Sequence, residues 1–413
     1  MIVRDGQAPL MGLAALLRLN FSGADLTPVG QALLARIETD AADAHALMDA
    51  AIILQFKGSP DVALAMQQHA LELRRHYRLP ARSEPPQLRV LALMAPGDLM
   101  ANVPLECLLE DSEIDLHLHY VLPGDTLGSA LPEHDVLFVA LSETEQNRPL
   151  LAQLHLDLAG WPRPVLNRAE HIPRVARDRA STILSGIPAI AMPPTVRVAR
   201  AVLAQLALEG ALPERLVGTS NFPLIVRPLD SHAGHDLERV DDAAALCRYL
   251  GAVAADAFFV SPFVDYRSPD GLFRKYRVAL IDGAPFACHM AVSTHWMIHY
   301  LNADMADSAA KRAEEAHFMA TFDSGFARRH NAALHAIHAA MGLDYVCIDC
   351  AELADGRLLI FEVDHAMIVH ALDPVDLFPY KLPQMHKVFQ AFRDMLGRHS
   401  RISRSSAPPR DPP

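Results

Sequence analysis

Residues 345–364 read YVCIDCAELADGRLLIFEVD and contain the most informative pattern of the chain. Two apolar runs, 345–349 and 358–364, are separated by the turn Asp355-Gly356. Short apolar runs on either side of an Asp-Gly turn are typical of a β-hairpin. We therefore expect two buried strands joined by this turn.

Three carboxylates interrupt these apolar strands, namely Asp349 in the first and Glu362 and Asp364 in the second. Side chains two residues apart share one face of a strand, and Asp349 could join Glu362 and Asp364 across the hairpin. Carboxylates that converge among apolar residues repel one another unless a divalent cation lies between them, and oxygen ligands suit Mg²⁺. We expect a magnesium site here. The alternative is three edge-strand carboxylates that face water.

Length and composition exclude several classes of protein. The 413 residues predict two or three domains, and 51% hydrophobic residues are enough for substantial cores. A net charge of -12 without a long basic run weighs against nucleic acid as a partner. The five cysteines are scattered, and no apolar run is long enough to cross a bilayer. We expect a cytoplasmic protein with no membrane segment.

The N-terminal residues 1–82 are expected to be helical. Small residues such as Ala51, Ala63 and Ala70 flank a Gly-Ser-Pro turn at a spacing that lets two antiparallel helices approach closely. The pattern resembles one tetratricopeptide-type hairpin, although Gln67 replaces the expected aromatic residue. One repeat cannot bury its own face, so we expect it to dock on the rest of the chain, on a second copy in a homodimer, or on a protein or peptide partner. An Ala-rich helical cap is the alternative.

Residues 80–87 form a proline-rich linker, after which the pattern changes. Short apolar runs now alternate with helical segments, which predicts βαβ units and a small parallel sheet. The expected strands are 88–95, 117–122 and 134–140, and the expected helices are 104–110 and 172–185.

Further along the chain, a strand at 223–228 contains Arg227 and leads into a polar loop at 229–235. A cation at the end of a buried strand, followed by Gly and hydroxyl donors, can clamp a triphosphate. An ordinary surface turn is the alternative. The segments that follow are a helix at 241–250, a strand at 257–260, a hairpin at 275–292 and a helix at 328–341.

The order of these motifs resembles the ATP-grasp superfamily, most of all its glutathione-synthetase-like and ribosomal-protein-modifying ligases. The resemblance covers residues 88–380 and implies an α/β (α+β) fold. The implied organisation is a helical segment at 1–82, a small parallel-sheet pre-ATP-grasp domain at 87–195, a two-part ATP-grasp domain at 196–398 and a disordered tail at 399–413.

The resemblance also implies an activity. ATP-grasp ligases use ATP and one or two Mg²⁺ ions to activate a carboxylate as an acyl phosphate, which an amine then attacks. The implied partners are small-molecule or peptide carboxylates and amines.

Several residues take family roles by their positions. Arg179 and Arg227 stand where phosphate-binding lysines are usual, and Ser231, His232 and Gly234 belong to the loop over the phosphates. Val260 and Phe263 match the hinge whose backbone reads adenine, and Asp265 matches a ribose contact. Asp349, Glu362 and Asp364 match the magnesium ligands, and Arg277 matches an arginine common in the hairpin after the hinge.

The chain departs from the family pattern at three places. Both lysines are arginines, which differ from lysine in geometry. Asp364 stands where asparagine is more usual, and His365-Ala-Met replaces a small Pro-Gly turn. Since that turn commonly faces the substrate, His365 is a candidate substrate contact.

Residues 295–302 are rich in histidine and aromatic residues. Helical spacing places His295, His299 and Asn302 on one face, where His295 and Asn302 are candidate substrate contacts. Besides Arg277, the candidates for a catalytic cation or acid–base group are His299, Arg312 and Arg328. The alternative is a polar helix face packed by two aromatic residues.

Two other functions stay open beside the ligase. One is a non-catalytic nucleotide-binding scaffold, favoured by the two arginines in place of lysines. The other is an ATP-dependent kinase for a small molecule. The pair Cys347 and Cys350 has no second pair to complete a zinc site, so we expect both thiols in the core.

Overall fold

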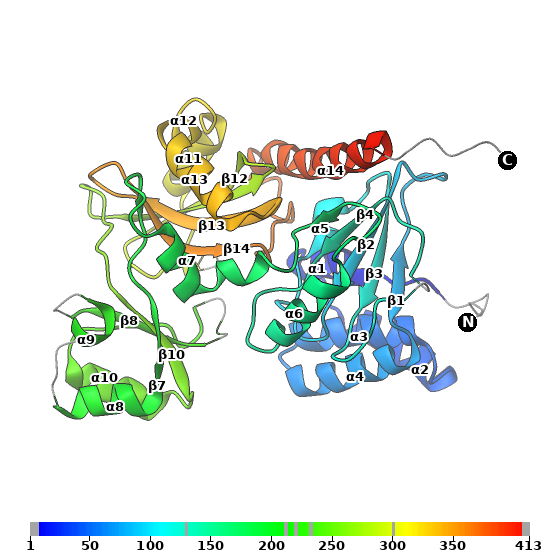
Figure 1. The fold of residues 1–413 in the computed structure, drawn as a ribbon, viewed down its shortest axis with the longest axis horizontal. Coiled ribbons are helices and arrows are strands. Elements are labelled where there is room, and N and C mark those ends of the chain that lie inside the picture. Colours follow the sequence, from blue (N-terminus) through cyan, green and yellow to red (C-terminus); the bar gives the residue numbers. More distant parts are fainter. Residues whose placement is uncertain are drawn as a thin grey trace. The chain divides into compact units, whose positions relative to one another are not determined.

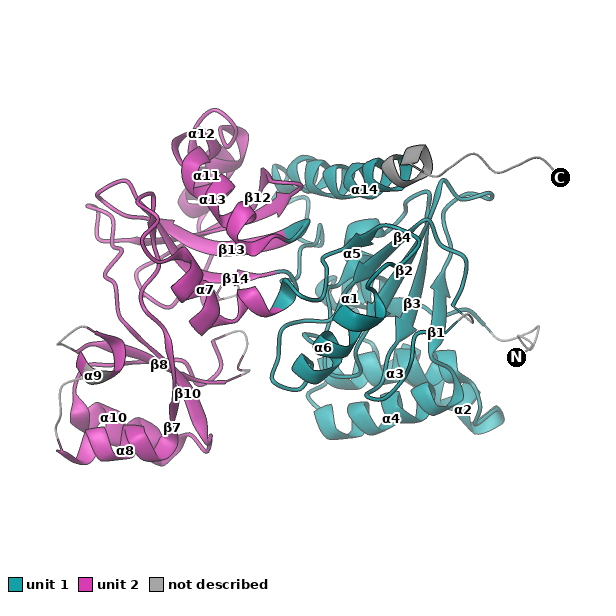
Figure 2. Cartoon of the chain, in the orientation of Figure 1, with its two compact units in different colours: residues 1–172, 343–345, 365–413 teal, residues 173–342, 346–364 magenta. Residues whose placement is uncertain are grey.

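The structure is a computed structural model that describes residues 8–128, 131–209, 214–218, 222–229, 231, 234–299 and 302–406. The chain has an α/β fold, and its contacts divide it into two compact units (Figure 2). Unit 1 comprises Met1–Ile172, Leu343–Tyr345 and His365–Pro413, and unit 2 comprises Pro173–Gly342 and Val346–Asp364. Each unit is described separately below.

Unit 1 combines an N-terminal group of helices with a sheet and a long C-terminal helix (Figure 1). Its helices are α1 (Gly12–Phe21), α2 (Thr27–Thr39), α3 (Ala44–Phe56), α4 (Pro60–Leu73), α5 (Leu105–Leu109), α6 (Arg148–Asp157) and α14 (Lys381–Ser406). Its strands are β1 (His76–Leu79), β2 (Leu88–Met94), β3 (Ile114–Tyr120), β4 (Val136–Val139) and β5 (Val165–Leu166).

The sheet of unit 1 has the order β1-β3-β2-β4-β5, and its pairs are parallel from β3 to β5. The small parallel sheet expected from the apolar runs is confirmed. Strand β1 corrects the prediction of an entirely helical N-terminus, because residues 76–79 pair antiparallel with β3. Pairing with a neighbouring strand outweighs local helix propensity here, and Tyr77 in the middle of β1 is fully buried.

Helices α3 and α4 form the expected hairpin. Gly58 adopts a φ of +73° in the turn, and Ala63 and Ala70 are fully buried between the helices. Gln67 docks the hairpin on the strand segment of unit 1: its Nε2 donates to the carbonyl of Gly97 at 3.0 Å, and its Oε1 accepts from the Gly97 amide at 2.9 Å. Docking on the rest of the chain is therefore confirmed, and the tetratricopeptide resemblance stays a prediction.

Helix α14 corrects the expected extent of the disordered tail. Residues 399–406 are the last turns of this helix, and residues 407–413 lie outside the described part of the chain. Phe392 anchors α14 in the core, with ring centroids 5.8 Å from Phe138 and 5.2 Å from Tyr345. The division into four domains otherwise stays a prediction.

Unit 2 contains two sheets. The 3₁₀ turn η1 (Ile172–Val175) leads into it. Its helices are α7 (Arg177–Leu184), α8 (Arg200–Glu209), α9 (Glu214–Val217), α10 (Ala243–Ala252), α11 (Ala309–Ala320), α12 (Phe326–Arg329) and α13 (Asn331–Met341). Its strands are β6 (Ile190–Ala191), β7 (Val196–Ala199), β8 (Leu224–Pro228), β9 (Glu238–Val240), β10 (Ala257–Pro262), β11 (Phe273–Ile281), β12 (Ala284–Ser293), β13 (Tyr345–Glu352) and β14 (Leu358–Asp364).

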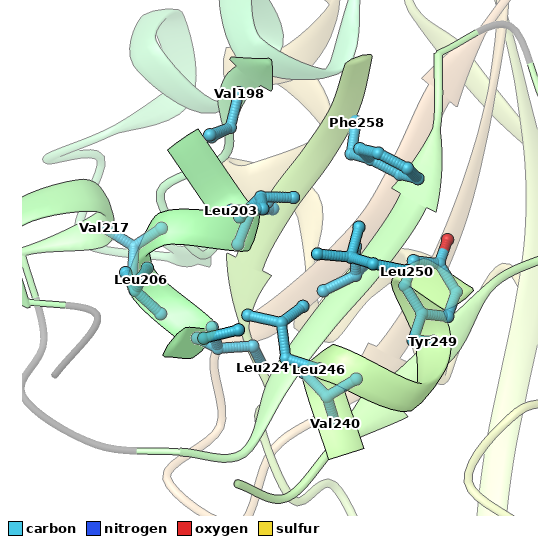
Figure 3. Packing of buried hydrophobic residues seen from close by; sticks show 13 residues of the cluster. Val198, Leu203, Leu206, Val217, Leu224, Val240, Leu246, Tyr249, Leu250 and Phe258 are labelled. Atoms are coloured by element: carbon cyan, nitrogen blue, oxygen red, sulfur yellow. The ribbon is translucent and has the colours of Figure 1, made fainter. Parts of the chain in front are cut away.

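The smaller sheet of unit 2 has the order β7-β10-β8-β9 and is antiparallel throughout. Helices α8 and α10 cover one face and form a core with the strands, in which Leu203, Leu246 and Phe258 are fully buried (Figure 3). This core holds strand β8 and therefore the position of Arg227.

The larger sheet of unit 2 has the order β12-β11-β13-β14-β6. Both expected hairpins, β11–β12 and β13–β14, are confirmed. The turn between β11 and β12 uses positive φ angles at Asp282 (+48°) and Gly283 (+79°), and Gly356 (+85°) does the same between β13 and β14.

The expected helix at 295–302 is absent from the described residues of that segment, which are a series of bends. Short-range hydrogen bonds organise it instead: the amide of His299 donates to Asn302 Oδ1 at 2.9 Å, and the amide of His295 donates to Ser293 Oγ at 3.1 Å. Side chains that satisfy backbone groups locally compete with a helix. Among the described residues, no helix has the length and apolarity needed to cross a membrane.

Candidate functional site

The carboxylates of the last hairpin face each other across two strands. Asp349 of β13 is the register partner of Glu362 of β14, and two residues further along Cys347 is the partner of Asp364. A β-bulge follows Asp349. Asp349 is only 3% exposed, and Glu362 and Asp364 are half-buried. The hairpin therefore brings two carboxylates directly opposite each other in a mostly apolar sheet.

Asp349 is held by two basic side chains of β11. Lys275 Nζ lies 3.0 Å from Asp349 Oδ2, and Arg277 donates from Nε to Oδ1 at 2.8 Å and from Nη2 to Oδ2 at 3.0 Å. Burial alone raises the pKa of Asp349, but the charges of Arg277 and Lys275 outweigh it and hold the pKa well below its usual range. Asp349 is thus ionised at neutral pH.

Glu362 has its own basic partners. Arg177 of α7 forms an ion pair with Glu362 Oε1, and Arg227 of β8 acts on it electrostatically. Burial raises the pKa of Glu362, but the charges of Arg177 and Arg227 outweigh burial, so that the pKa is lowered. Four cations therefore surround two carboxylates at the end of the hairpin.

The carboxylate pair fits a magnesium ion. In the described chain, the ligand oxygens of Asp349, Glu362 and Asp364 do not all lie within 4.8 Å of one another, so the expected three-residue ligand set is not assembled. Mg²⁺ in nucleotide sites usually takes one or two carboxylates and completes its shell with water and phosphate oxygens. Asp349 and Glu362, both ionised and directly opposite, meet that requirement.

The basic residue of α7 that reaches the site is Arg177, and the prediction of Arg179 needs correction. Arg179 is exposed, whereas Arg177 contacts both Glu362 and the carbonyl of Phe361. Residues two apart on a helix point in roughly opposite directions, so only one of them can face the carboxylates. The sequence contains both arginines, but it does not determine which of them the helix turns toward Glu362.

Arg227 lies where the resemblance implies a phosphate-binding cation. It is 7% exposed, its Nε donates to Ser231 Oγ at 3.1 Å, and a second nitrogen donates to the Ser231 carbonyl. Burial, assisted by the charge of Arg177, lowers the pKa of Arg227 to about 9, so it remains cationic at neutral pH. The contact with Ser231 joins strand β8 to its polar loop.

Two further residues were assigned to that loop. Gly234 has a φ of +76°, and a Cβ there would lie 3.2 Å from Met297 Sδ, so a larger residue would be strained. The loop therefore approaches the bends at 294–297. His232 lies outside the described residues.

The expected hinge is strand β10 and the residues after it. Val260 is fully buried in the small sheet, and Phe263 packs edge-on against Trp296 with centroids 5.6 Å apart. The guanidinium of Arg239 lies 4.4 Å from the centroid of the Phe263 ring. Asp265, the expected ribose contact, instead forms an exposed ion pair with Arg267.

The candidate catalytic residues divide into two groups. Arg277 contacts Asp349, and His299 lies close enough to Lys275 and Arg277 for their charges to affect it. Burial, followed by those charges, lowers the pKa of His299, which disfavours a cationic role and leaves it as a neutral acid–base group. Arg328 is exposed on α12 and is not part of this cluster in the described interactions.

The candidate substrate residues also separate. His295 and Asn302 are exposed and line a cavity of about 730 Å³ together with Arg239 and Trp296. His365 belongs to unit 1, where it is fully buried and its Nε2 donates to the carbonyl of Leu141 at 2.8 Å. This structural hydrogen bond explains why a histidine follows the last carboxylate, and it corrects the assignment of His365 to the substrate.

Lys275 is the residue that the sequence analysis missed. It lies two residues before Arg277 on β11, so both side chains share the face that meets Asp349. Period-two spacing from Arg277 could have identified it. Cys347 and Cys350 are fully buried and are not joined in a disulfide, as expected for core residues.

Comparison with known proteins gives a fold-level likeness to ligases. No family model and no curated protein matches the chain. A D-alanine–D-alanine ligase from Bacillus anthracis, complexed with ATP, is 15% identical with a TM-score of 0.45, over 78% of this chain and 99% of the other. The VanG D-Ala:D-Ser ligase from Enterococcus faecalis is 12% identical with a TM-score of 0.47, over 76% and 99%.

A RimK domain ATP-grasp protein from Sphaerobacter thermophilus is 16% identical with a TM-score of 0.40, over 74% of this chain and 99% of the other. Likenesses at this level of identity and TM-score establish neither the family nor the chemistry of this chain. The function therefore has to be argued from the residues of unit 2.

Proposed function

We propose that unit 2 binds ATP with Mg²⁺ and that the chain is an ATP-grasp ligase that joins a carboxylate to an amine through an acyl phosphate. The observation that carries the proposal is the opposed pair of buried Asp349 and half-buried Glu362, with basic side chains of β11, α7 and β8 around it. Such an arrangement suits a metal–polyphosphate complex, because the carboxylates can bind the metal ion and the basic side chains can bind the phosphates.

Asp349 and Glu362 are the residues that would hold the metal. Bound there, Mg²⁺ would supply charge neutralisation for the phosphates. Arg177 of α7 pairs with Glu362, and the charge of Arg227 of β8 acts on the same carboxylate. Their guanidinium groups can bind phosphate oxygens in the bidentate manner for which arginine is suited. This arrangement supports arginine as a replacement for the usual lysines.

The nucleoside is assigned to the hinge. Val260 is a buried strand residue whose neighbours fix the backbone, and Phe263 offers an aromatic surface at the end of the same strand. The guanidinium of Arg239 already stacks on the Phe263 ring, and a purine could stack beside these two planar groups. Asp265 would have to leave Arg267 to reach a ribose.

The acceptor chemistry is assigned to the face of β11 and the segment after β12. Arg277 and Lys275 place two positive charges beside Asp349, where they can stabilise the charge that develops on a reacting carboxylate. His299, with its lowered pKa, can take the proton from an attacking amine.

Turnover assays separate this function from its rivals. Incubation with ATP, Mg²⁺ and pooled amino acids or short peptides should release ADP and phosphate and yield a new amide. ATP binding without turnover in any pool would favour the non-catalytic scaffold. The ion pairs of Asp349 with both Lys275 and Arg277 also favour that alternative, because they already balance its charge. ADP release with a phosphorylated product would favour the kinase.

A variant pair ties the activity to the carboxylates. Glu362→Gln should lower Mg²⁺-dependent turnover by at least about 100-fold, since it removes a metal ligand rather than an outer contact. Asp355→Asn is the control, because Asp355 is exposed in the turn of the same hairpin and pairs only locally with Arg357. Full activity in the Glu362 variant would contradict the metal assignment.

A further inference from the structure

Three histidines gather on one face of the unit 1 sheet, far along the chain from the carboxylate pair. His117 and His119 lie two residues apart on β3, so they share a face. His76 of β1 is the register partner of His119 and therefore lies on that same face. The strand pairing thus sets three imidazoles side by side on two adjacent antiparallel strands.

Two of these rings are already within ligand distance of each other. His117 Nδ1 lies 3.1 Å from His76 Nε2, and the two rings stack with centroids 5.1 Å apart. Two nitrogen ligands of a tetrahedral zinc ion, each bonded at about 2.0–2.1 Å, are about 3.4 Å apart. The ring of His119 is 6.3 Å from that of His76. Among the described residues the ligand atoms of the three histidines do not all lie within 4.8 Å of one another, so His119 would have to turn toward the pair.

A buried carboxylate orients the central histidine. Asp115 is 2% exposed, and its Oδ2 lies 3.3 Å from His117 Nε2. Arg78 holds Asp115 through Nε at 2.8 and 3.0 Å from its two oxygens. A proton on His117 Nε2 leaves the Nδ1 lone pair directed at His76. A histidine that binds a metal through one ring nitrogen usually donates a hydrogen bond from the other nitrogen, often to a carboxylate.

The remaining nitrogen atoms have unused capacity. Within the described part of the chain, Nδ1 of His76 and Nδ1 of His119 are buried and have no hydrogen-bond partner. A buried nitrogen of this kind is costly unless something binds it. His76 would bind the ion through Nε2, so Nδ1 of His119 is the unsatisfied atom that could turn to the ion. Burial, followed by the charge of His117, lowers the pKa of His76 to about 4, and burial also lowers the pKa of His117 and of His119.

We propose that His76, His117 and His119 bind one transition-metal ion of the Zn²⁺ class, with Asp115 as the residue that positions His117. Imidazole nitrogen suits zinc, copper and nickel, whereas Mg²⁺ prefers oxygen, so the site differs in chemistry from the carboxylate pair. Three protein ligands leave a fourth position for water or an anion. The alternative is a hydrogen-bonded imidazole stack that binds no ion.

Metal titration of the full-length chain tests the site. After dialysis against a chelator, the protein should bind one equivalent of Co²⁺ with a visible absorption band typical of tetrahedral nitrogen coordination. Excess Zn²⁺ should displace it, and excess Mg²⁺ should not. Isothermal titration should give the same stoichiometry for Zn²⁺.

Variants assign the ligands. His119→Gln and His76→Gln should each abolish the band, and Asp115→Asn should weaken Zn²⁺ binding by about 10–100-fold. Circular dichroism verifies that each variant is folded. The control is His335→Gln, because His335 is exposed on α13 and hydrogen-bonds only to the backbone of its own helix. Equal Co²⁺ binding by the wild type and His119→Gln, or no binding by the wild type, would overturn the proposal.

Discussion

Asp349 is the residue on which the candidate site depends, because it contacts the cations of β11 and is one of the two carboxylates proposed to hold the metal. Arg277 contacts both carboxylate oxygens of Asp349, at 2.8 and 3.0 Å, and Lys275 contacts Oδ2 at 3.0 Å. A divalent cation that binds Asp349 must compete with two positive charges. Metal affinity at this site should therefore depend on Lys275 and Arg277 as well as on the carboxylates.

Removing one of these charges should strengthen metal binding. Lys275→Met leaves Arg277 to support Asp349 but relieves repulsion of a divalent ion by about 1–2 kcal/mol, which corresponds to a roughly tenfold tighter affinity. Titration with Mn²⁺, followed by electron paramagnetic resonance, measures the change. Lys387→Met on the exposed side of α14 is the charge-matched control and should leave the affinity unchanged. Weaker Mn²⁺ binding in Lys275→Met would contradict this view of the site.

The positions of side chains could be predicted from the sequence where a single hairpin sets them. Period-two spacing and the Asp-Gly turn were enough to predict that Asp349 and Glu362 face each other. The choice between Arg177 and Arg179 depended on the phase of α7 relative to β14, which is a tertiary property. Period-two spacing puts Lys275 on the same face of β11 as Arg277. The contact of that face with Asp349 depended on the pairing of β11 with β13, which is a tertiary property.

At the scale of elements, the docking of the helical hairpin rests on one buried side chain. Gln67 makes two hydrogen bonds to the backbone of Gly97, one to its carbonyl and one from its amide. Gln67→Ala should lower the free energy of unfolding by about 1–3 kcal/mol, because the carbonyl and the amide of Gly97 lose their hydrogen-bond partner. Urea unfolding measures this loss.

The neighbouring residue provides the control. Gln68 is exposed on α4 and bonds only to Glu72 on the same helix, at 3.2 Å. Gln68→Ala should therefore change the free energy of unfolding by less than about 0.5 kcal/mol. Equal effects of the two substitutions would mean that the contact with Gly97 does not stabilise the hairpin.

The start of α1 makes stability depend on pH. Asp49 is fully buried and accepts from the amides of Met11 and Gly12, both at 2.9 Å. Burial raises the pKa of Asp49 to about 6, above its ordinary value of 3.8. Between pH 4 and pH 6 the folded chain therefore binds more protons than the unfolded chain, and this contribution to stability is lost as pH rises through that window.

Asp49→Asn should remove this contribution. Its free energy of unfolding, relative to wild type, should increase by about 2–3 kcal/mol between pH 4 and pH 7, since one pKa unit corresponds to about 1.4 kcal/mol. Urea unfolding at both pH values checks the difference, with Asp61→Asn on the exposed side of α4 as control. A difference between variant and wild type that does not change with pH would contradict the assignment.

Elements were predictable where the sequence pattern and the tertiary contacts agree. Apolar runs gave the parallel strands β2, β3 and β4 and the hairpins of unit 2. Strand β1 was not predicted, because residues 76–79 owe their conformation to pairing with β3. The helix predicted at 295–302 is absent from the described residues, where side chains such as Ser293 accept hydrogen bonds from backbone amides.

At the scale of the whole molecule, each unit has its own core and its own candidate site. The described residues of the carboxylate site, from Arg177 to Asp364, belong to unit 2, and the histidine cluster belongs to unit 1. The chain enters unit 2 at Pro173, returns briefly to unit 1 at Leu343–Tyr345, and leaves unit 2 after Asp364, the last of the three carboxylates (Figure 2).

This division predicts separate responses to two ligands. Hydrogen exchange with Mg²⁺ and ATP should show protection in residues 173–342 and 346–364, because a ligand stabilises the structure that binds it. Zn²⁺ should instead protect β1 and β3. Protection of β1 and β3 by ATP, with none in unit 2, would place the nucleotide outside the site described above.

The most direct measurement is a crystal structure with Mg²⁺ and a non-hydrolysable ATP analogue. It should show a metal ion about 2.0–2.1 Å from carboxylate oxygens of Asp349 and Glu362, with phosphates on Arg177 and Arg227. It would contradict the account if the nucleotide bound elsewhere while Asp349 kept Lys275 and Arg277 as its partners.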